Sequence, residues 1–180
     1  MNRHNKGFSI PEVMVAMFIL TVGLISVLAL FSTAVDTMSS AQDDLIAKQK
    51  AREAMESVYT ARESTQLSFN SINNTTTSGG VFMTGFRNLT AAGSDGLLGT
   101  TDYGAIDTMI LPGPDGMLGT SDDQIRTLSN FQRQISITPV IDTTGNTNPD
   151  LRNLSVTIQF TNIRGGQRNY TVTSMISRFR

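Results

Sequence analysis

Acidic side chains in glycine-rich turns are the first residues of this sequence that could do chemistry. The ten residues 93–102 recur twenty positions later as 113–122, and seven of the ten positions are identical. The segment 91–123 holds six aspartates and no basic residue, so it carries a charge of −6. Its candidate metal ligands are Asp95, Asp102, Asp115, Asp122 and Asp123.

These aspartates support two interpretations. Carboxylate oxygens in loops are ligands that Ca²⁺ prefers, so calcium is the candidate cofactor. Uncompensated acid at this density favours that interpretation. The same Asp-Gly and Gly-Thr steps also form plain turns on either side of a strand at 106–111. The spacing does not match an EF-hand loop, and both interpretations stay open here.

Other catalytic chemistry has few residues to use. The chain has no cysteine and one histidine, His4, which excludes disulfides and Cys-ligated metals and leaves few nucleophile–base pairs. A hydrolase that uses Asp122 and Asp123 is a remote alternative, because no partner motif accompanies them. We therefore expect a protein that is not an enzyme. With 180 residues, 14 of them basic and 15 acidic, we expect one modest domain without general affinity for nucleic acids.

The N-terminal segment has the composition of a membrane span. Glu12 is followed by 23 uncharged residues that end at Val35. As a helix, the most apolar stretch, 13–31, would extend about 28 Å, nearly the thickness of a bilayer core. Basic residues precede it, so we expect a single pass with a cytoplasmic N-terminus. A secretory signal cleaved near residues 32–34 is the plainer alternative, but Glu12 lies at the wrong end for one.

A family resemblance rests on the residues Lys6-Gly7-Phe8-Ser9-Ile10-Pro11-Glu12-Val13 and the apolar segment after them. They resemble the class III leader of type IV pilins and pseudopilins. The resemblance implies that a prepilin peptidase cuts between Gly7 and Phe8 and methylates the new N-terminal Phe8. Glu12 then becomes the fifth mature residue, where the family keeps its glutamate.

The resemblance also implies partners and a location. The partners are other pilins or pseudopilins, an assembly platform protein and its ATPase machinery. The precursor is expected in the bacterial inner membrane, and the mature subunit in a pilus or pseudopilus in the periplasm or at the cell surface. Because subunits at the very tip often lack the glutamate, Glu12 places this chain beneath another subunit.

Glu12 has a physical role that fits this family. A carboxylate at the edge of a membrane helix is costly unless it is paired, and cleavage would create an ammonium on Phe8 one helical turn away. Glu12 of one subunit can then meet the Phe8 amine of its neighbour and fix the register between them. Removing one partner of such a pair costs about 3–5 kcal/mol. The plainer interpretation is a solvated Glu12 that starts the helix, with Pro11 in the first turn.

The helical pattern continues well past the apolar span. Apolar residues recur at three- and four-residue steps, and no proline interrupts the chain between Pro11 and residue 64. This predicts one helix over 9–64, about 80 Å long. Its apolar face in the second half is expected to hold Met38, Ala41, Leu45, Met55 and Val58. Major pilins commonly have a proline within the apolar half, where this chain has Ala29, so any local melting would depend on Gly23. This difference favours a minor subunit.

The rest of the chain predicts a small sheet behind a polar loop. Residues 64–94 are rich in Ser, Thr, Asn and Gly and predict a surface loop, within which 81–83 and Phe86 return to the helix. Strands are expected at 106–111, 131–141, 154–160 and 170–177, with a hairpin turn at 164–167. About four antiparallel strands against the helix give an α+β, type IV pilin-like fold.

The C-terminal end is basic, with five arginines and no acid from residue 151 onward. We expect these arginines at hairpin tips and strand edges, or against acidic surfaces of neighbouring subunits. DNA is a weaker candidate partner, because no aromatic residues alternate with the charge. The two last strands resemble those of minor pilins of the pilus-modification type and of I-type minor pseudopilins of type II secretion.

These patterns divide the chain into four parts: a leader, 1–7; a membrane or filament-core helix, 8–35; an amphipathic helix, 36–64; and a head, 65–180, with Asp/Gly loops at 93–123 and a sheet at 131–180. The expected function is that of a minor type IV pilin-like structural subunit, which requires no cofactor. A minor pseudopilin of type II secretion is the first alternative. The second is a membrane-anchored calcium-binding or adhesive domain that does not polymerise.

Overall fold

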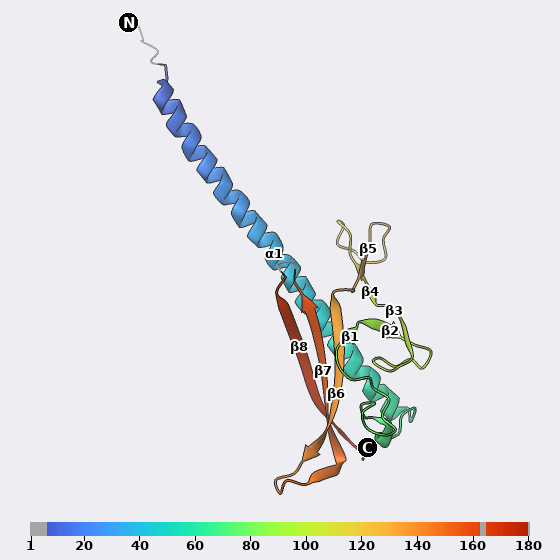
Figure 1. Ribbon diagram of the computed structural model, residues 1–180. Coiled ribbons are helices and arrows are strands. Elements are labelled where there is room, and N and C mark those ends of the chain that lie inside the picture. The colour runs from blue at the N-terminus through green and yellow to red at the C-terminus, as the bar shows by residue number, and fades with distance from the viewer. Residues whose placement is uncertain (1–6, 163–164, 180) are drawn as a thin grey trace. The chain divides into compact units, whose positions relative to one another are not determined.

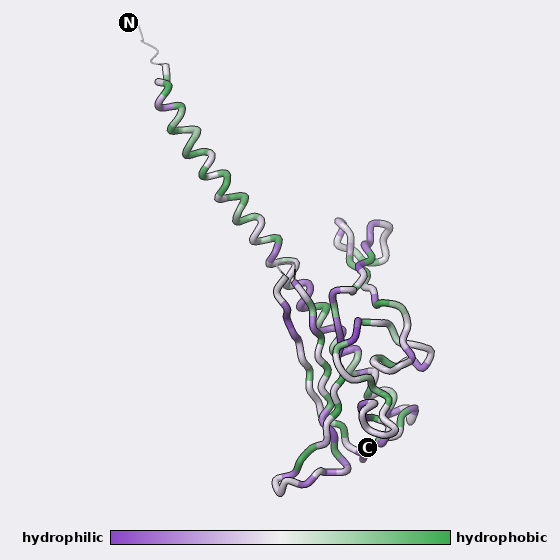
Figure 2. The backbone as a smooth tube through the Cα atoms, in the orientation of Figure 1, coloured by the Kyte–Doolittle hydropathy of each residue, from purple (hydrophilic) through white to green (hydrophobic). Residues whose placement is uncertain are grey.

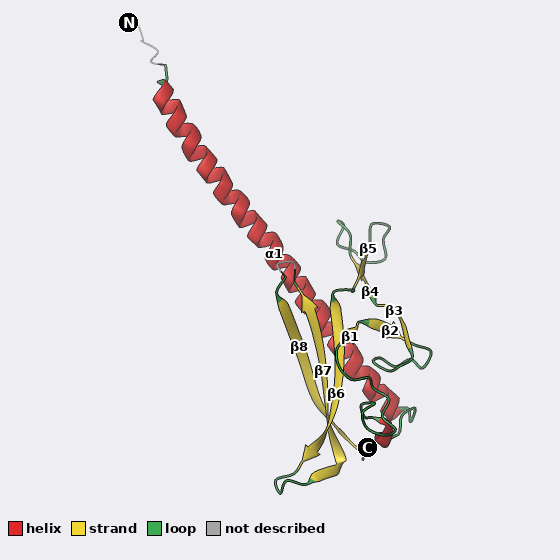
Figure 3. Cartoon of the chain, viewed as in Figure 1, coloured by secondary structure: helices red, strands yellow, loops and turns green. Residues whose placement is uncertain are grey.

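A computed structural model describes residues 7–162 and 165–179 of the chain. Residues 1–6 of the expected leader and Arg164 of the expected hairpin turn lie outside the described residues. The chain divides into two compact units, residues 1–42 and 43–180. One long helix, α1 (Ile10–Glu63), contributes to both units (Figure 3). The predicted helix, 9–64, is thus confirmed to within one residue at each end.

The first unit consists of the N-terminal part of α1. Figure 2 shows apolar residues along nearly all of it. The helix passes through Gly23 without interruption. Straight-chain and branched apolar residues can form this helix without a break because no proline follows Pro11 within it.

The second unit is built on a four-stranded antiparallel sheet with the strand order β1-β6-β7-β8 (Figure 1). Its strands are β1 (Arg87–Asn88), β6 (Phe131–Ile141), β7 (Thr147–Thr161) and β8 (Gln167–Ser177). The three long strands contain the predicted strands 131–141, 154–160 and 170–177. Pro139 lies at a register shift in β6, beyond the two residues that pair with β1, so its missing N–H removes no bond from the sheet interior.

Two small antiparallel sheets accompany this one. The first pairs β2 (Thr90–Ala92) with β3 (Tyr103–Ile106), and the second pairs β4 (Thr108–Leu111) with β5 (Gln124–Thr127). The prediction of a single strand at 106–111 is therefore wrong. The chain changes partners at Asp107, whose N–H donates to Leu89 O and whose carbonyl accepts from the Leu128 N–H, both at 2.9 Å.

The segment predicted as a surface loop, 64–94, has more structure than expected. It contains a 3₁₀ turn, η1 (Phe69–Ser71), as well as β1 and β2. Phe82 in this segment is fully buried in the core that includes residues of α1, and Val81 packs against this core. The expected return is therefore confirmed for residues 81 and 82, whereas Met83 and Phe86 line a cavity at the surface.

The core of the second unit lies between α1 and the main sheet. Its helix side is mainly alanine, with Ala47, Ala51 and Ala54 fully buried. Its sheet side includes Phe131 and Phe160, register partners on β6 and β7 whose rings stack with centroids 5.2 Å apart.

The predicted apolar helix face is only partly confirmed. Met55 and Val58 are buried, but Met38 and Leu45 are 74% and 64% exposed, and Ala41 is exposed as well. The buried face includes Asp43 and Lys50 instead. Small side chains let the sheet approach the helix closely. Arg126 on β5 neutralises Asp43, and Asp107, between β3 and β4, neutralises Lys50 together with Glu53 of the helix.

Candidate functional site

The start of α1 carries a contact from the Glu12 side chain back to the backbone of Ser9. The backbone N–H of Ser9 donates to Glu12 Oε2 at 3.4 Å, and the Val13 N–H donates to the Ser9 carbonyl at 3.2 Å. Ser9 and Glu12 stand three residues apart, which is the spacing of a capping box. A carboxylate in the first turn also interacts favourably with the positive end of the helix dipole.

The expected cleavage position lies just before this turn. Gly7 and Phe8 precede the helix in a non-helical segment, and Phe8 is 83% exposed. A methyl group added at Gly7 would meet no atom within 4 Å. The peptide bond between them therefore lies in an exposed, non-helical segment.

The helix behind Glu12 presents apolar side chains in every direction. All residues from 7 to 35 are exposed, and the helix has the length and composition to cross a membrane. Its hydroxyl groups donate to carbonyls one turn back, at 2.8 Å from Thr21 to Met17 and 2.8 Å from Ser26 to Val22. Because these polar groups are satisfied within the helix, they add little cost in lipid or in an apolar filament core.

The first Asp/Gly loop, residues 93–102, is closed by its two aspartates. Asp95 Oδ1 accepts from the Leu97 N–H at 2.8 Å, and Asp102 Oδ2 accepts from the Asp95 N–H at 3.0 Å. The Ser94 hydroxyl donates to Asp102 at 2.7 Å. This hydroxyl, together with the loop N–H groups, lowers the pKa of Asp102 below its ordinary value of 3.8.

The second Asp/Gly loop, residues 113–123, repeats this arrangement. Asp115 Oδ1 accepts from the Met117 N–H at 2.8 Å, and Asp122 Oδ2 accepts from the Asp115 N–H at 3.3 Å. The Thr120 hydroxyl donates to Asp122 at 2.6 Å and, with the loop N–H groups, lowers the pKa of its carboxyl group. Asp123 Oδ2 accepts from the Gly119 N–H at 2.7 Å.

The aspartates predicted as calcium ligands therefore gather in two separate loops rather than in one site. Their oxygens accept hydrogen bonds from the loops themselves, which is the arrangement of Asx turns. Among the described residues, no three histidine, cysteine or carboxylate side chains are placed to hold a metal ion. Calcium binding by Asp95, Asp102, Asp115, Asp122 and Asp123 stays a prediction.

Buried ion pairs attach the β4–β5 hairpin, which bears the second loop, to α1. Arg126 on β5 pairs with Asp43 at 2.7 Å, and the Asp43 side chain is only 2% exposed. Lys50 pairs with Asp107 at 2.7 Å and with Glu53 at 2.8 Å. Burial opposes the charge on Lys50, but the hydrogen bonds that its ammonium donates to Asp107 and Glu53, together with their negative charges, outweigh burial and raise the pKa of the lysine.

Sequence reasoning did not predict these pairs. A signal was present in their spacing. The two residues lie seven apart, and Ala47 and Ala54 follow them by four residues each. Positions with this spacing share one helix face, and the small alanine side chains on that face favour close packing.

A further cation is buried near these pairs. Arg133 on β6 is 4% exposed, and it donates to the Thr90 carbonyl at 3.2 Å. Burial lowers its pKa, while Glu53 and Asp107 favour its charge. Its register partner across the β1–β6 pair is Arg87, which is exposed.

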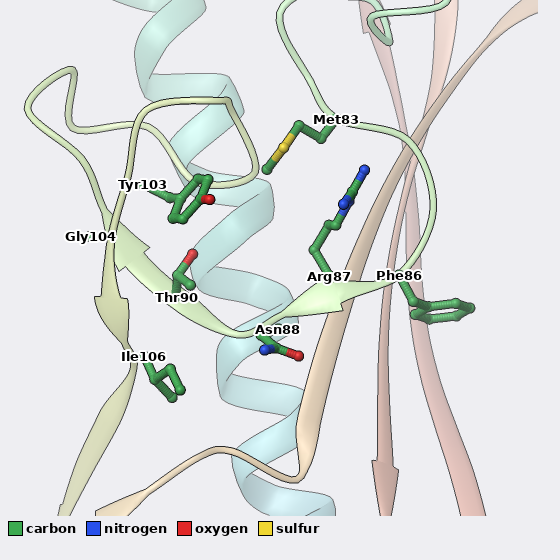
Figure 4. Close-up of a pocket in the computed structure, with 8 residues that line it drawn as sticks. All are labelled: Met83, Phe86, Arg87, Asn88, Thr90, Tyr103, Gly104 and Ile106. Carbon is green, nitrogen blue, oxygen red and sulfur yellow. The ribbon is translucent and has the colours of Figure 1, made fainter.

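Arg87 lines an open cavity of about 440 Å³. Figure 4 shows Arg87 on β1 and Tyr103 on β3 on either side of Met83. The other lining residues are Phe86, Asn88, Thr90, Gly104 and Ile106. None of the eight lining residues is acidic. The cavity therefore combines an apolar wall with one cation.

The C-terminal arginines that the structure describes pair within the chain. Arg168 contacts Asp44 at 2.9 Å, and Arg178 contacts Asp150 at 3.1 Å. The guanidinium of Arg152 lies 4.4 Å from the centroid of the Phe69 ring and donates to the Phe69 carbonyl at 2.7 Å. Arg164 and Arg180 lie outside the described residues. These contacts agree with the expectation of edge charges and supply no feature that is specific to nucleic acid.

Comparison with known proteins gives one result, at the N-terminus. The family model of the prokaryotic N-terminal methylation motif matches residues 2–32, the stretch that contains Gly7, Phe8 and Glu12. Neither the curated proteins nor the solved structures include a match to this chain.

Proposed function

We propose that this chain is a minor type IV pilin-like structural subunit, because residues 2–32 match the prokaryotic N-terminal methylation motif and resemble the class III leader of type IV pilins and pseudopilins. In this proposal prepilin peptidase cleaves after Gly7 and methylates Phe8. The mature chain then leaves the inner membrane and enters a type IV pilus, where it supports pilus assembly or modification.

The observation that carries the proposal is the combination of Glu12 with the exposed apolar helix behind it. All residues from 7 to 35 are exposed, and Glu12 is the only charged residue among them. An apolar surface of this extent needs lipid or other apolar helices around it. A lone carboxylate at its end needs a cation in the same surroundings.

The geometry of the precursor supports an exchange of partners by Glu12. The Ser9 N–H holds the carboxylate at 3.4 Å, which is long for a hydrogen bond to an ionised acceptor. The ammonium created on Phe8 by cleavage would be a stronger partner. When the amine belongs to a neighbouring subunit, the contact sets the axial register between the two chains.

The first experiment is mass spectrometry of the protein from cells that contain a prepilin peptidase. We expect a chain that begins at N-methylated Phe8. A chain that keeps residues 1–7, or one cut near residue 34, contradicts the proposal.

The second experiment separates pairing by Glu12 from capping by Glu12. Glu12→Gln keeps an oxygen that accepts from the Ser9 N–H but removes the charge. We expect Glu12→Gln to lose incorporation into filaments as fully as Glu12→Ala does. If Glu12→Gln assembles normally, the residue only caps the helix.

A minor pseudopilin of type II secretion would use the same leader and helix, so the two roles are separated in cells. Deletion of the gene should reduce surface filaments if the chain is a pilin and secretion of exported enzymes if it is a pseudopilin. A membrane-anchored calcium-binding or adhesive domain would leave both unchanged. In that case a rise in melting temperature at millimolar Ca²⁺ would support a role for the Asp/Gly loops.

A further inference from the structure

The two Asp/Gly loops differ in what covers their apolar residues. In the first loop, Leu97 and Leu98 are each 5% exposed. At the matching positions of the second loop, Met117 and Leu118 are 64% and 65% exposed. The first loop shows that this sequence motif can bury its apolar pair when a surface is available.

The second loop is ordered without such a surface. Asp115 and Asp122 accept the same two backbone hydrogen bonds as Asp95 and Asp102 in the first loop. Gly116 and Gly119 have φ angles of 70° and 89°, close to the 71° and 82° of Gly96 and Gly99. The β4–β5 hairpin, which bears the second loop, is held to α1 by the ion pair between Arg126 and Asp43. An apolar pair on a preformed loop can bind a partner with little loss of conformational entropy.

The cavity beside β1 has the complementary chemistry. Its apolar wall is exposed, with Tyr103 at 58% and Ile106 at 42%. Arg87 supplies a positive charge, and no acid is among the lining residues (Figure 4). The second loop has the opposite character, because it carries three aspartates and no basic residue. A surface of one sign that meets one of the other sign sets the orientation of a contact.

We infer that the second loop of one copy of this chain docks in the Arg87 cavity of a second copy. Met117 and Leu118 enter against Tyr103 and Ile106, and the acidic loop faces Arg87. The contact joins two different surfaces, so it is heterologous and leaves a free loop at one end and a free cavity at the other. Repetition of such a contact builds an open filament rather than a closed dimer. This inference rests on the proposed function and names the neighbour within the filament.

Cysteine crosslinking tests the contact, because the chain has no cysteine of its own. Full-length chains with Ser121→Cys and with Asn88→Cys are produced together in cells that assemble the filament, and are oxidised with copper phenanthroline. Both positions are exposed, and neither belongs to the apolar pair or to the apolar wall. We expect a disulfide-linked dimer from the mixture. A chain with both substitutions should give a ladder of higher oligomers.

Matched variants show whether the crosslink reports this contact. Leu118→Ser should lower its yield roughly tenfold, because it removes a buried leucine from the contact, whereas Leu118→Met should keep the yield. Arg87→Glu should lower the yield and Arg87→Lys should keep it. In the positional control, Thr173→Cys on β8 takes the place of Asn88→Cys in the mixture with Ser121→Cys, and we expect no crosslink.

The outcomes separate the inference from the proposed function. Filaments with a mature N-terminus and no crosslink, or with an equal crosslink from Thr173→Cys, overturn the docking contact and leave the proposed function standing. Glu12→Gln is expected to prevent assembly of the filament. If the crosslink persists in that variant, the two copies dock as inferred, but they do so outside the filament as well.

Discussion

The loops at 93–102 and 113–123 share most of their sequence and their internal hydrogen bonds, yet their surroundings are opposite. The first is bonded to the rest of the unit. The Leu98 N–H donates to Ser57 Oγ at 3.3 Å, and the Gly99 carbonyl accepts from the Met83 N–H at 2.8 Å. The second loop forms hydrogen bonds among its own residues, 113–123, and presents Met117 and Leu118 to solvent.

This difference separates two levels of structure. The conformation of each loop follows from local chemistry, in which glycine supplies positive φ angles and aspartate closes the turn. Burial follows from the elements that flank the loop. Ion pairs hold the hairpin of the second loop at β5 and at Asp107, whereas apolar packing holds the first loop directly. Each mode of attachment predicts a different response to mutation.

The largest effect is expected from the buried ion pairs. Lys50→Met leaves Asp107 and Glu53 without their cation, and we expect a loss of about 3 kcal/mol in the free energy of unfolding. Lys48→Met, at an exposed position two residues earlier, should change it by less than about 0.5 kcal/mol. Urea titration of the full chain in detergent, followed by tyrosine fluorescence, measures both. Equal effects would show that the Lys50 pairs contribute nothing specific.

The next effect compares the leucines at matching loop positions. Leu98→Ala should cost about 2–5 kcal/mol, because it empties a buried site in the core. Leu118→Ala should change the stability of the isolated chain by less than about 0.5 kcal/mol, since its side chain is already in solvent. The same urea titration distinguishes them. A large loss from Leu118→Ala would mean that the second loop is covered within its own chain.

These differences also show what the sequence could and could not reveal. The leader, the single long helix and the strands β6 to β8 follow from local patterns, because charge, apolar length and alternation are properties of neighbouring residues. The burial of Asp43 and Lys50 depends on Arg126 and Asp107, which are distant in sequence. A local pattern does not identify such partners.

The split of the predicted strand at Asp107 has a similar cause. The residues 106–111 alternate well enough for one strand, but Asp107 bonds to Leu89 and Leu128 and carries the partner of Lys50. Tertiary pairing therefore overrides the local β pattern. For the candidate site, the sequence indicated Gly7, Phe8 and Glu12, and the Asp/Gly duplication. It did not indicate that only one of the two loops is covered.

A smaller effect is expected from glycines at matching positions. Gly99 and Gly119 both have positive φ angles, so Gly99→Ala and Gly119→Ala share a backbone cost of about 1–2 kcal/mol. A methyl group at Gly99 would also lie 2.6 Å from Ile135 Cδ1, whereas a methyl group at Gly119 would have no atom within 4 Å. Gly99→Ala should therefore lower the urea midpoint further. Identical midpoints would mean that the Ile135 side chain gives way without cost.

The smallest effect concerns the protonation of the loop aspartates, where the two loops reach one result by different donors. The first loop uses the Ser94 hydroxyl for Asp102, but the matching position of the second loop is Pro114, which has no donor. There Thr120 supplies the hydroxyl to Asp122 instead. Both contacts lower the pKa of the carboxyl group below 3.8. A lowered pKa means that the folded loop favours the ionised form, so the stabilisation is complete above pH 3.8 and is lost as the pH falls through the lowered value.

Carboxyl ¹³C titration of two variants tests whether each hydroxyl acts on its own loop alone. We expect Ser94→Ala to raise the pKa of Asp102 and leave that of Asp122 unchanged. We expect Thr120→Val to raise the pKa of Asp122 and leave that of Asp102 unchanged. If either substitution moves both aspartates, the loops are not independent copies of one local structure, and the surroundings rather than the repeated sequence determine their conformation.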